Sequence, residues 1–156
     1  MLHLSSQELR EHRQKFRENN KHKYLPEASL IADKESTALF NVAGMQQLIP
    51  FLVGKEHTLG KRLYNIQKCV RTNDIDDIGD ERHLSLFEMM GNRSLGDYFK
   101  QESITWTIQF LHDELQIPLD KIGATVFAGD EKQGIPRDEE SIAVLEKLGI
   151  THIKEM

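Results

Sequence analysis

Two short runs of alternating hydrophobic and polar residues lie in the middle of the chain, on either side of a polar segment. Residues 66–71 alternate with a period of two, and so do residues 83–90. Such alternation is typical of strands that present one face to a protein core. The segment between them, residues 72–82, is rich in Asp and Asn and contains Gly79, which is typical of a loop. The pattern predicts an antiparallel hairpin with a long polar loop.

One face of this hairpin collects polar and aromatic side chains. The alternation places Arg71 on one face of the first strand, together with Gln67 and Cys69. If the strands pair, His83, Phe87 and Met89 of the second strand can share that face. His83 and Phe87 would then lie about 13 Å apart at the usual strand rise. A cation and a ring set apart by such a length suit a nucleoside triphosphate, with its phosphates at one end and its base at the other.

Helical spacing appears on both sides of the hairpin. Residues 5–8, Ser-Ser-Gln-Glu, have the spacing of a capping box and predict the start of a helix. A longer helix is predicted over residues 97–115, with Asp97 as its N-cap. Pro136 and Asp138 introduce another helix, which Gly149 ends. With β-prone runs at residues 123–127 and 150–153, the pattern predicts an α+β fold.

Composition narrows the class of protein. The chain has 156 residues, of which 38% are hydrophobic and 29% charged, and this predicts a single soluble domain over residues 1–156. No apolar run has membrane-spanning length and no secretory signal is visible, so we expect a cytoplasmic protein with no membrane partner. The single cysteine, Cys69, excludes an internal disulfide, and the scattered histidines predict no metal site made within the chain.

Charge leaves two interpretations of the N-terminal helix open. The net charge of −5 is unfavourable for wrapping a nucleic acid, so any contact with RNA must be local or made by other parts of a larger protein. The basic side chains are densest near the N-terminus, and they are either a solvated helix face or a contact for phosphates. They are Arg10, Arg13, Lys15, Arg17, Lys21 and Lys23.

The sequences of three segments resemble those of a known family. An Arg ending one strand, a variable loop and then His-x-x-x-Phe on the next strand resemble motif 2 of the class II aminoacyl-tRNA synthetases. Gln-Lys-Cys-Val-Arg-Thr-Asn-Asp-Ile, Arg-His-x-x-x-Phe-Glu-Met and Gly-Asn-x-Ser-x-Gly-Asp-Tyr-Phe-Lys resemble the alanyl-tRNA synthetase family more closely. Residues 38–45 resemble the family's Leu-Phe-x-x-Ala-Gly-Met signature in the motif 1 region, where Gly44 permits a close backbone approach or a tight turn.

The resemblance implies a fold and an activity. The fold would be class II synthetase-like, with a mostly antiparallel sheet flanked by helices. The activity would be that of an alanine–tRNA ligase, which uses ATP and Mg²⁺ to form alanyl-adenylate and then transfers alanine to tRNA(Ala). No Mg²⁺ ligand can be assigned in this chain. Motif 1 would contribute to a dimer interface or to core packing.

Residue roles follow from the same resemblance. Arg71 would be the catalytic cation, bridging the α-phosphate and the attacking carboxylate. Phe87 would stack on adenine, Arg82 or His83 would reach the β- and γ-phosphates, and Met89 would flank the base or fill the core. The acidic loop, which includes Asp74, Asp76, Asp77 and Asp80, would lie near the tRNA acceptor end. No tRNA-binding residue can be assigned.

The chain also departs from the family. Asn73 replaces the usual acidic residue of motif 2, and Arg93 and Leu95 stand where aromatic residues are common. Motifs 1 and 2 are present, but no motif 3 is found, so we expect the N-terminal portion of a catalytic domain, with a partner chain carrying motif 3 as one possibility. The alternative is a catalytically incomplete fragment or split subunit that binds an adenylate or a partner.

Overall fold

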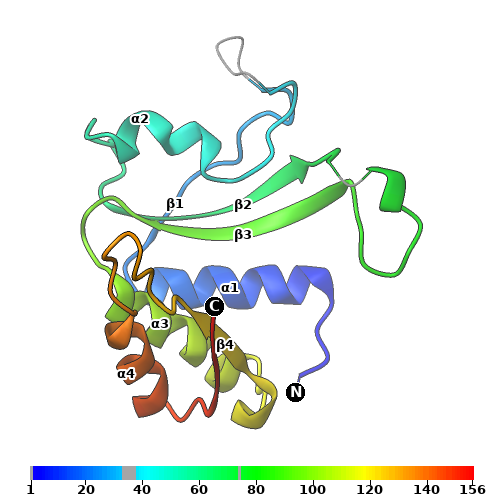
Figure 1. The fold of residues 1–156 in the computed structure, drawn as a ribbon. Coiled ribbons are helices and arrows are strands. Elements are labelled where there is room, and N and C mark those ends of the chain that lie inside the picture. The colour runs from blue at the N-terminus through cyan, green and yellow to red at the C-terminus, as the bar shows by residue number, and fades with distance from the viewer. Residues whose placement is uncertain (1, 33–37, 74) are drawn as a thin grey trace. The chain divides into compact units, whose positions relative to one another are not determined.

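The β2–β3 hairpin is the centre of a three-stranded sheet. The computed structural model describes residues 2–32, 38–73 and 75–156. Strand β2 spans Arg62–Val70 and β3 spans Leu86–Ser94, and they pair antiparallel from Arg62 opposite Ser94 to Val70 opposite Leu86. The short strand β1, Lys23–Tyr24, pairs parallel with the start of β2 (Figure 1). The predicted hairpin is confirmed.

The boundaries of the second strand differ from the prediction. The alternating run suggests residues 83–90, whereas β3 begins at Leu86 and continues to Ser94. His83 therefore lies in the loop, where its N–H binds the Asp80 carboxylate at 2.7 Å. The extension to Ser94 includes Gly91 and polar residues, which carry no strand pattern but pair with the start of β2.

The chain divides into two compact units, residues 13–97 and residues 1–12 with 98–156. The core of the first unit is small, with Leu25, Leu48 and Leu63 buried and with Phe51 and Leu95 packed on them. Leu48 ends the 3₁₀ turn η1, Gln46–Leu48, which leads into helix α2, Ile49–Leu52. This segment, which follows the Ala-Gly-Met signature, is thereby attached to the sheet through Leu48 and Leu63.

Helix α1, Ser6–Asn19, begins with the predicted capping box. The Ser5 N–H donates to the Glu8 carboxylate at 2.7 Å, and the Glu8 N–H donates to Ser5 Oγ at 3.3 Å. Two of its basic residues, Arg13 and Arg17, are buried, and Arg13 Nη2 donates to Asn92 Oδ1 of β3 at 2.9 Å. Those two arginines are therefore neither a solvated face nor an exposed contact for phosphates.

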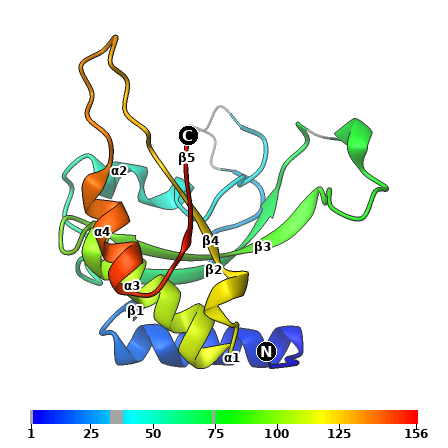
Figure 2. The ribbon, with the colours of Figure 1, turned by 60° about the horizontal axis from the view of Figure 1, so that its bottom comes forward.

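The second unit combines helices and helical turns with a parallel strand pair. Helix α3, Lys100–Gln109, continues as the π-helical turn η3, Phe110–Glu114, and a 3₁₀ turn, η4, covers Leu119–Lys121. Strands β4, Gly123–Val126, and β5, His152–Glu155, run side by side, and helix α4 spans Glu139–Lys147 (Figure 2). The buried core is formed by Ile108, Ile122, Val126, Ile142, Leu145 and Ile150.

The sequence predicts that one helix begins at Asp97 and another near Asp138. Only the second prediction is confirmed. Asp138, which was expected with Pro136 to introduce a helix, is the N-cap of α4, and its carboxylate accepts from the Ser141 N–H at 3.2 Å. A hydrogen bond from the Lys100 ammonium, with others from Ser141, lowers the pKa of Asp138 to about 2. Asp97, in contrast, does not cap α3, whose N-cap position is Phe99. The Asp97 carboxylate instead pairs with Arg62 Nε at the start of β2, a partner that the local sequence could not reveal.

The fold is α+β, as predicted, with small sheets. The antiparallel part is the β2–β3 pair, whereas β1–β2 and β4–β5 are parallel. The expectation of a mostly antiparallel sheet is met in the hairpin but not in the second unit. Within the described ranges, no helix is long and apolar enough to cross a membrane.

Burial of His22 predicts a pH-dependent stability. Its side chain is 2% exposed, and burial together with the neighbouring Arg17 cation lowers the pKa of His22 to about 4. The unfolded chain, with an ordinary histidine pKa near 6.5, binds the proton more readily, so folding stability should fall as the pH drops from about 6.5 to 4. We expect a loss on the order of 3 kcal/mol from this residue. Urea unfolding across that range should show a shallower pH slope for His22→Gln than for the wild type, and equal slopes would contradict the assignment.

Candidate functional site

Arg71 and Phe87 lie on one face of the hairpin. Phe87 is directly opposite Cys69 in the ladder, and the Arg71 N–H donates to the Ser85 carbonyl at 2.9 Å, which extends the same register by one residue. The Arg71 guanidinium carbon lies 5.2 Å from the centre of the Phe87 ring. The two side chains are therefore diagonal neighbours across the strands, a separation that a long side chain can bridge.

The distance between cation and ring is shorter than the alternation suggests. The pattern predicts a guanidinium and a ring that stand a nucleotide's length apart, but they are in contact in a cation–π arrangement. The prediction of the shared face was correct and that of the separation was wrong. A base that stacks on this face of Phe87 must displace the Arg71 guanidinium, whose flexible side chain permits this.

Arg71 is held at one nitrogen and carries further donors. Its Nε–H donates to the Val42 carbonyl at 3.1 Å, and the side chain is exposed. Among the described residues, no carboxylate forms an ion pair with Arg71. A guanidinium fixed at Nε still presents two terminal nitrogens, which match the oxygen spacing of a phosphate or a carboxylate. In this orientation Arg71 can therefore bind an anion through its two terminal nitrogens while its Nε is held in place.

Residues 41–44 lie against the same face of the sheet. The Val70 N–H donates to the Asn41 carbonyl at 2.9 Å, and Asn65 Nδ2 donates to the Gly44 carbonyl at 3.1 Å. The Gly44 N–H approaches Met89 Sδ at 3.4 Å. A Cβ on Gly44 would lie only 3.0 Å from both terminal atoms of the Asn65 side chain. The expectation of a close backbone approach at Gly44 is confirmed, and a larger residue there would require the Asn65 side chain or the segment to shift.

Two buried polar side chains of β2 were not assigned roles from the sequence. Asn65 binds Gly44, and Gln67 binds both backbone groups of Ala28, accepting from its N–H at 2.8 Å and donating to its carbonyl at 3.0 Å. Both are 1% exposed. The alternating pattern correctly put Gln67 on the same face as Arg71. It could not reveal the hydrogen-bond partners of Asn65 and Gln67, which lie more than twenty residues away along the chain. These two amides attach the preceding segments to the sheet.

Cys69 is a structural residue of the same strand. Its thiol is buried and donates to the Gln67 carbonyl at 3.4 Å. Burial raises the pKa of Cys69, although the nearby Arg71 cation opposes this. A buried thiol with a raised pKa is a poor nucleophile. The cysteine therefore supports the strand rather than reacting.

Arg82 and His83 are organised by Asp80. One oxygen of the Asp80 carboxylate accepts from the N–H groups of Arg82, at 2.8 Å, and His83, at 2.7 Å. The other lies 2.7 Å from His83 Nδ1. These hydrogen bonds lower the pKa of Asp80, and the bond from the His83 N–H has the largest effect. No described contact joins Arg82 or His83 to Arg71 or Phe87, so their roles stay predictions. Asp74, which the acidic loop was expected to include, lies outside the described residues.

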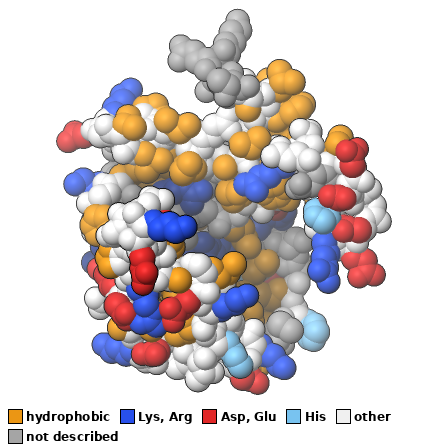
Figure 3. Space-filling model, in the orientation of Figure 1, with side chains coloured by type: hydrophobic (Ala, Val, Ile, Leu, Met, Phe, Trp, Pro, Cys, Tyr) orange, Lys and Arg blue, Asp and Glu red, His pale blue; other side chains and the backbone are white. Residues whose placement is uncertain are grey.

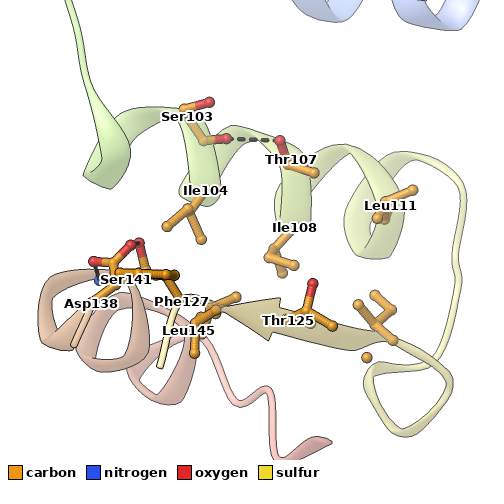
Figure 4. A pocket seen from close by; sticks show the side chains of 14 residues that line it. Ser103, Ile104, Thr107, Ile108, Leu111, Thr125, Phe127, Asp138, Ser141 and Leu145 are labelled. Carbon is orange, nitrogen blue, oxygen red and sulfur yellow. Dashed lines mark hydrogen bonds between the residues drawn. The ribbon is translucent and has the colours of Figure 1, made fainter. Parts of the chain in front are cut away.

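A cavity of about 390 Å³ lies in the other unit, between α3, β4 and α4 (Figure 4). Ile104, Ile108 and Leu145 line it, and two of the hydroxyls at its edge are bonded, with Thr107 donating to the Ser103 carbonyl and Ser141 to Asp138. It contains none of the residues predicted for the site. The residues that line it include no cation that could bind an anion.

Metal ligands are not clustered in the part of the chain that the structure describes. No group of three His, Cys, Asp or Glu side chains there could hold an ion. The Asp80 carboxylate is bonded to Arg82 and His83. A magnesium ion at this site would therefore depend on the oxygens of a bound polyphosphate, which Mg²⁺ commonly uses.

Comparison with known proteins identifies the class. Residues 8–155 match the family described as tRNA synthetases class II (A). The match extends over most of the chain and includes the hairpin, its loop and the Ala-Gly-Met segment. The chain therefore belongs to the class II tRNA synthetase family.

Named relatives narrow this further. The chain is 49% identical to the alanine–tRNA ligase of Treponema denticola over 150 residues, which cover 95% of this chain and 25% of the relative. It is 47% identical to that of Treponema pallidum over 154 residues, covering 96% of this chain and 25% of the relative. The alanine–tRNA ligase of Rubrobacter xylanophilus is 40% identical over 154 residues, covering 99% of this chain and 17% of the relative. The chain thus spans about a quarter of the length of the Treponema relatives.

The Asp80 arrangement predicts how the loop responds to mutation. Replacing Asp80 by Ala removes the acceptor of the Arg82 and His83 N–H groups, so both amides should exchange with solvent faster than in the wild type. We expect an increase of about fivefold, because one loop hydrogen bond contributes on the order of 1 kcal/mol. Amide exchange followed by NMR tests this, with the β2 amides as an internal control. Unchanged exchange at both residues would show that the carboxylate does not organise the loop.

Proposed function

We propose that this chain forms the ATP-binding part of an alanine–tRNA ligase, which activates alanine as alanyl-adenylate and transfers it to tRNA(Ala). The observation that carries the proposal is the pairing of the Arg71 guanidinium with the Phe87 ring on one sheet face of a class II synthetase chain. The relatives named alanine–tRNA ligase support the choice of amino acid and tRNA. ATP, alanine and tRNA(Ala) are the proposed substrates.

The chemistry needs positioning and charge rather than a protein nucleophile. An alanine carboxylate oxygen attacks the α-phosphorus of ATP, the new oxygen–phosphorus bond forms, and the bond to pyrophosphate breaks. A hydroxyl of the tRNA terminus then attacks the activated carbonyl, and AMP leaves. Arg71 would turn away from the Phe87 ring and from the Val42 carbonyl that its Nε binds, and its terminal nitrogens would bind the α-phosphate and the carboxylate.

The remaining site residues take roles along the same face. Phe87 would stack on the adenine once the guanidinium has turned to the phosphate, and Met89, two residues further on this face, would flank the base. Arg82 or His83 would bind the β- and γ-phosphates, with Asp80 holding their backbone in place. Mg²⁺ bound to the polyphosphate would supply neutralisation of the charge on the leaving pyrophosphate.

A second function is favoured by the surface around α2. Large hydrophobic side chains there are exposed, among them Val53, 82% exposed, and Ile49, 52% exposed (Figure 3). Apolar surface of this kind commonly marks a contact with another protein segment. The chain would then be a nucleotide- or partner-binding module, and a partner carrying motif 3 would complete the enzyme.

Replacing Arg71 tests the proposed catalysis. The 156-residue chain is grafted in place of the matching quarter of the Treponema denticola relative, and ATP–pyrophosphate exchange is measured. Arg71→Ala should lower exchange by about 10²–10³-fold, because a donor to the developing charge is lost. Lys68→Ala, on the opposite face of the same strand, should leave exchange near the wild-type rate. Wild-type exchange in Arg71→Ala would refute the assignment, and ATP binding by a graft that performs no exchange would favour the binding module.

Replacing Phe87 tests the base contact separately. Phe87→Leu keeps an apolar side chain but removes the ring, so ATP affinity should fall about tenfold, in line with the loss of one base–aromatic stack. Calorimetric titration of the 156-residue chain measures this, and the unfolding midpoint shows whether the hairpin remains intact. Equal affinity in wild type and variant would place the base elsewhere.

A further inference from the structure

Arg93 lies on the same face of β3 as Phe87 and Met89, and the proposed function gives it no role. Its side chain turns back along the strand over Gly91. A Cβ on Gly91 would lie 2.9 Å from Arg93 Nη1 and 3.0 Å from Nη2. The absence of a side chain at Gly91 is therefore what allows the guanidinium to reach toward Met89.

The guanidinium contacts two groups of its own strand. Nη1 donates to the Asn92 carbonyl at 2.8 Å, and Nη2 lies 3.9 Å from Met89 Sδ. The backbone bond restrains the guanidinium, and in this orientation the second nitrogen faces the sulfur. Such fixed presentation of donors is a property of arginine that lysine lacks.

The Met89 thioether is consequently held from two sides. The Gly44 N–H approaches the sulfur at 3.4 Å from the segment 41–44, and Arg93 approaches it from further along β3. Methionine has three rotatable side-chain bonds and adapts readily to different spaces. A sulfur held by two donors from different segments has far fewer conformations than the side chain would otherwise adopt.

We propose that Arg93 is a positioning residue for the nucleotide, which holds the Met89 thioether against the Gly44 amide and so fixes the surface that the base meets beside Phe87. This rests on the proposed function, because it assumes that the base stacks on Phe87. Met89 is the next residue on that face, about 7 Å along the strand, which is within the width of a purine. Arg93 acts through Met89 and does not itself touch the nucleotide.

The position of Met89 bears on which purine is accepted. A fixed Met89 thioether beside the Phe87 ring gives the base pocket a defined depth. A mobile thioether can occupy the pocket or move out of it, so the depth of the pocket varies. Discrimination between adenine and guanine depends on such fixed contacts at the edge of the base. The loss of Arg93 should therefore weaken the binding of ATP more than the binding of GTP.

The test uses the 156-residue chain and four variants. Arg93→Met keeps the length of the side chain but removes its donors, and Arg93→Lys keeps the cation with a single amine. Gly91→Ala leaves Arg93 in the chain but places a Cβ 2.9 Å from both Arg93 Nη1 and Asn65 Oδ1, so it displaces the guanidinium by a different route and also presses on the Asn65 side chain. Lys68→Met removes a cation from the opposite face of the hairpin and is the matched control.

Affinities for ATP and GTP are measured by calorimetric titration. Arg93→Met and Gly91→Ala should bind ATP about two- to tenfold more weakly, the cost of ordering one flexible side chain on binding, with GTP affinity less affected. Arg93→Lys should recover part of the loss, and Lys68→Met should match the wild type. The unfolding midpoint and the methyl resonance of ¹³C-labelled Met89 are recorded without nucleotide, and that resonance should shift in Arg93→Met and Gly91→Ala.

Each outcome decides between the proposals. If the wild type binds ATP and Arg93→Met binds both nucleotides as the wild type does, the role of Arg93 is refuted while the proposed function stands. Equal losses for ATP and GTP together with a lower unfolding midpoint reduce Arg93 to a structural residue. An unchanged Met89 resonance refutes the contact itself. A wild-type chain that binds no ATP overturns the proposed function and, with it, the role of Arg93.

Discussion

The register of β2 against β3 is the constraint on which the site depends. With Cys69 opposite Phe87 and Gln67 opposite Met89, one face of the hairpin receives the Arg71 cation, the Phe87 ring and the Met89 thioether. A slip of β3 by one residue would turn Phe87 and Met89 to the face opposite Arg71. The opposite face is occupied by Arg13 and Glu18 of α1, which bind Asn92 and Tyr64. Pairing, rather than any single side chain, therefore creates the surface that we assign to a nucleotide.

That surface is completed by a segment that approaches it closely. Residues 41–44 contact the hairpin through the carbonyls of Asn41, Val42 and Gly44 and through the Gly44 N–H. Arg71 is itself one of the donors, so the proposed catalytic cation also attaches this segment to the sheet. Glycine at positions 44 and 91 provides the space in which these backbone and side-chain groups meet. The signature around Gly44 and the hairpin thus form one surface, although they are separated along the chain.

Local patterns predicted the elements whose causes are local. The capping box at Ser5 and the helix introduced at Asp138 were correct because each start depends on residues three positions apart. Asp97 was wrong as a cap because Arg62, 35 residues earlier, competes for its carboxylate. His83 was wrong as a strand residue because Asp80 binds its N–H in the loop. In both cases a specific hydrogen bond outweighed a weak local preference.

The sequence by itself determined the class of protein, the hairpin and the shared face of Arg71 and Phe87, because a period of two fixes side-chain direction and long motifs are specific to a family. Only the tertiary structure decided that the cation contacts the ring, that Arg13 and Arg17 are buried, and that Asn65, Gln67 and Arg93 contact backbone or side-chain groups around the same surface. Several of these contacts join groups far apart along the chain, and all of them depend on how the strands and segments pack, which neither periodicity nor composition encodes.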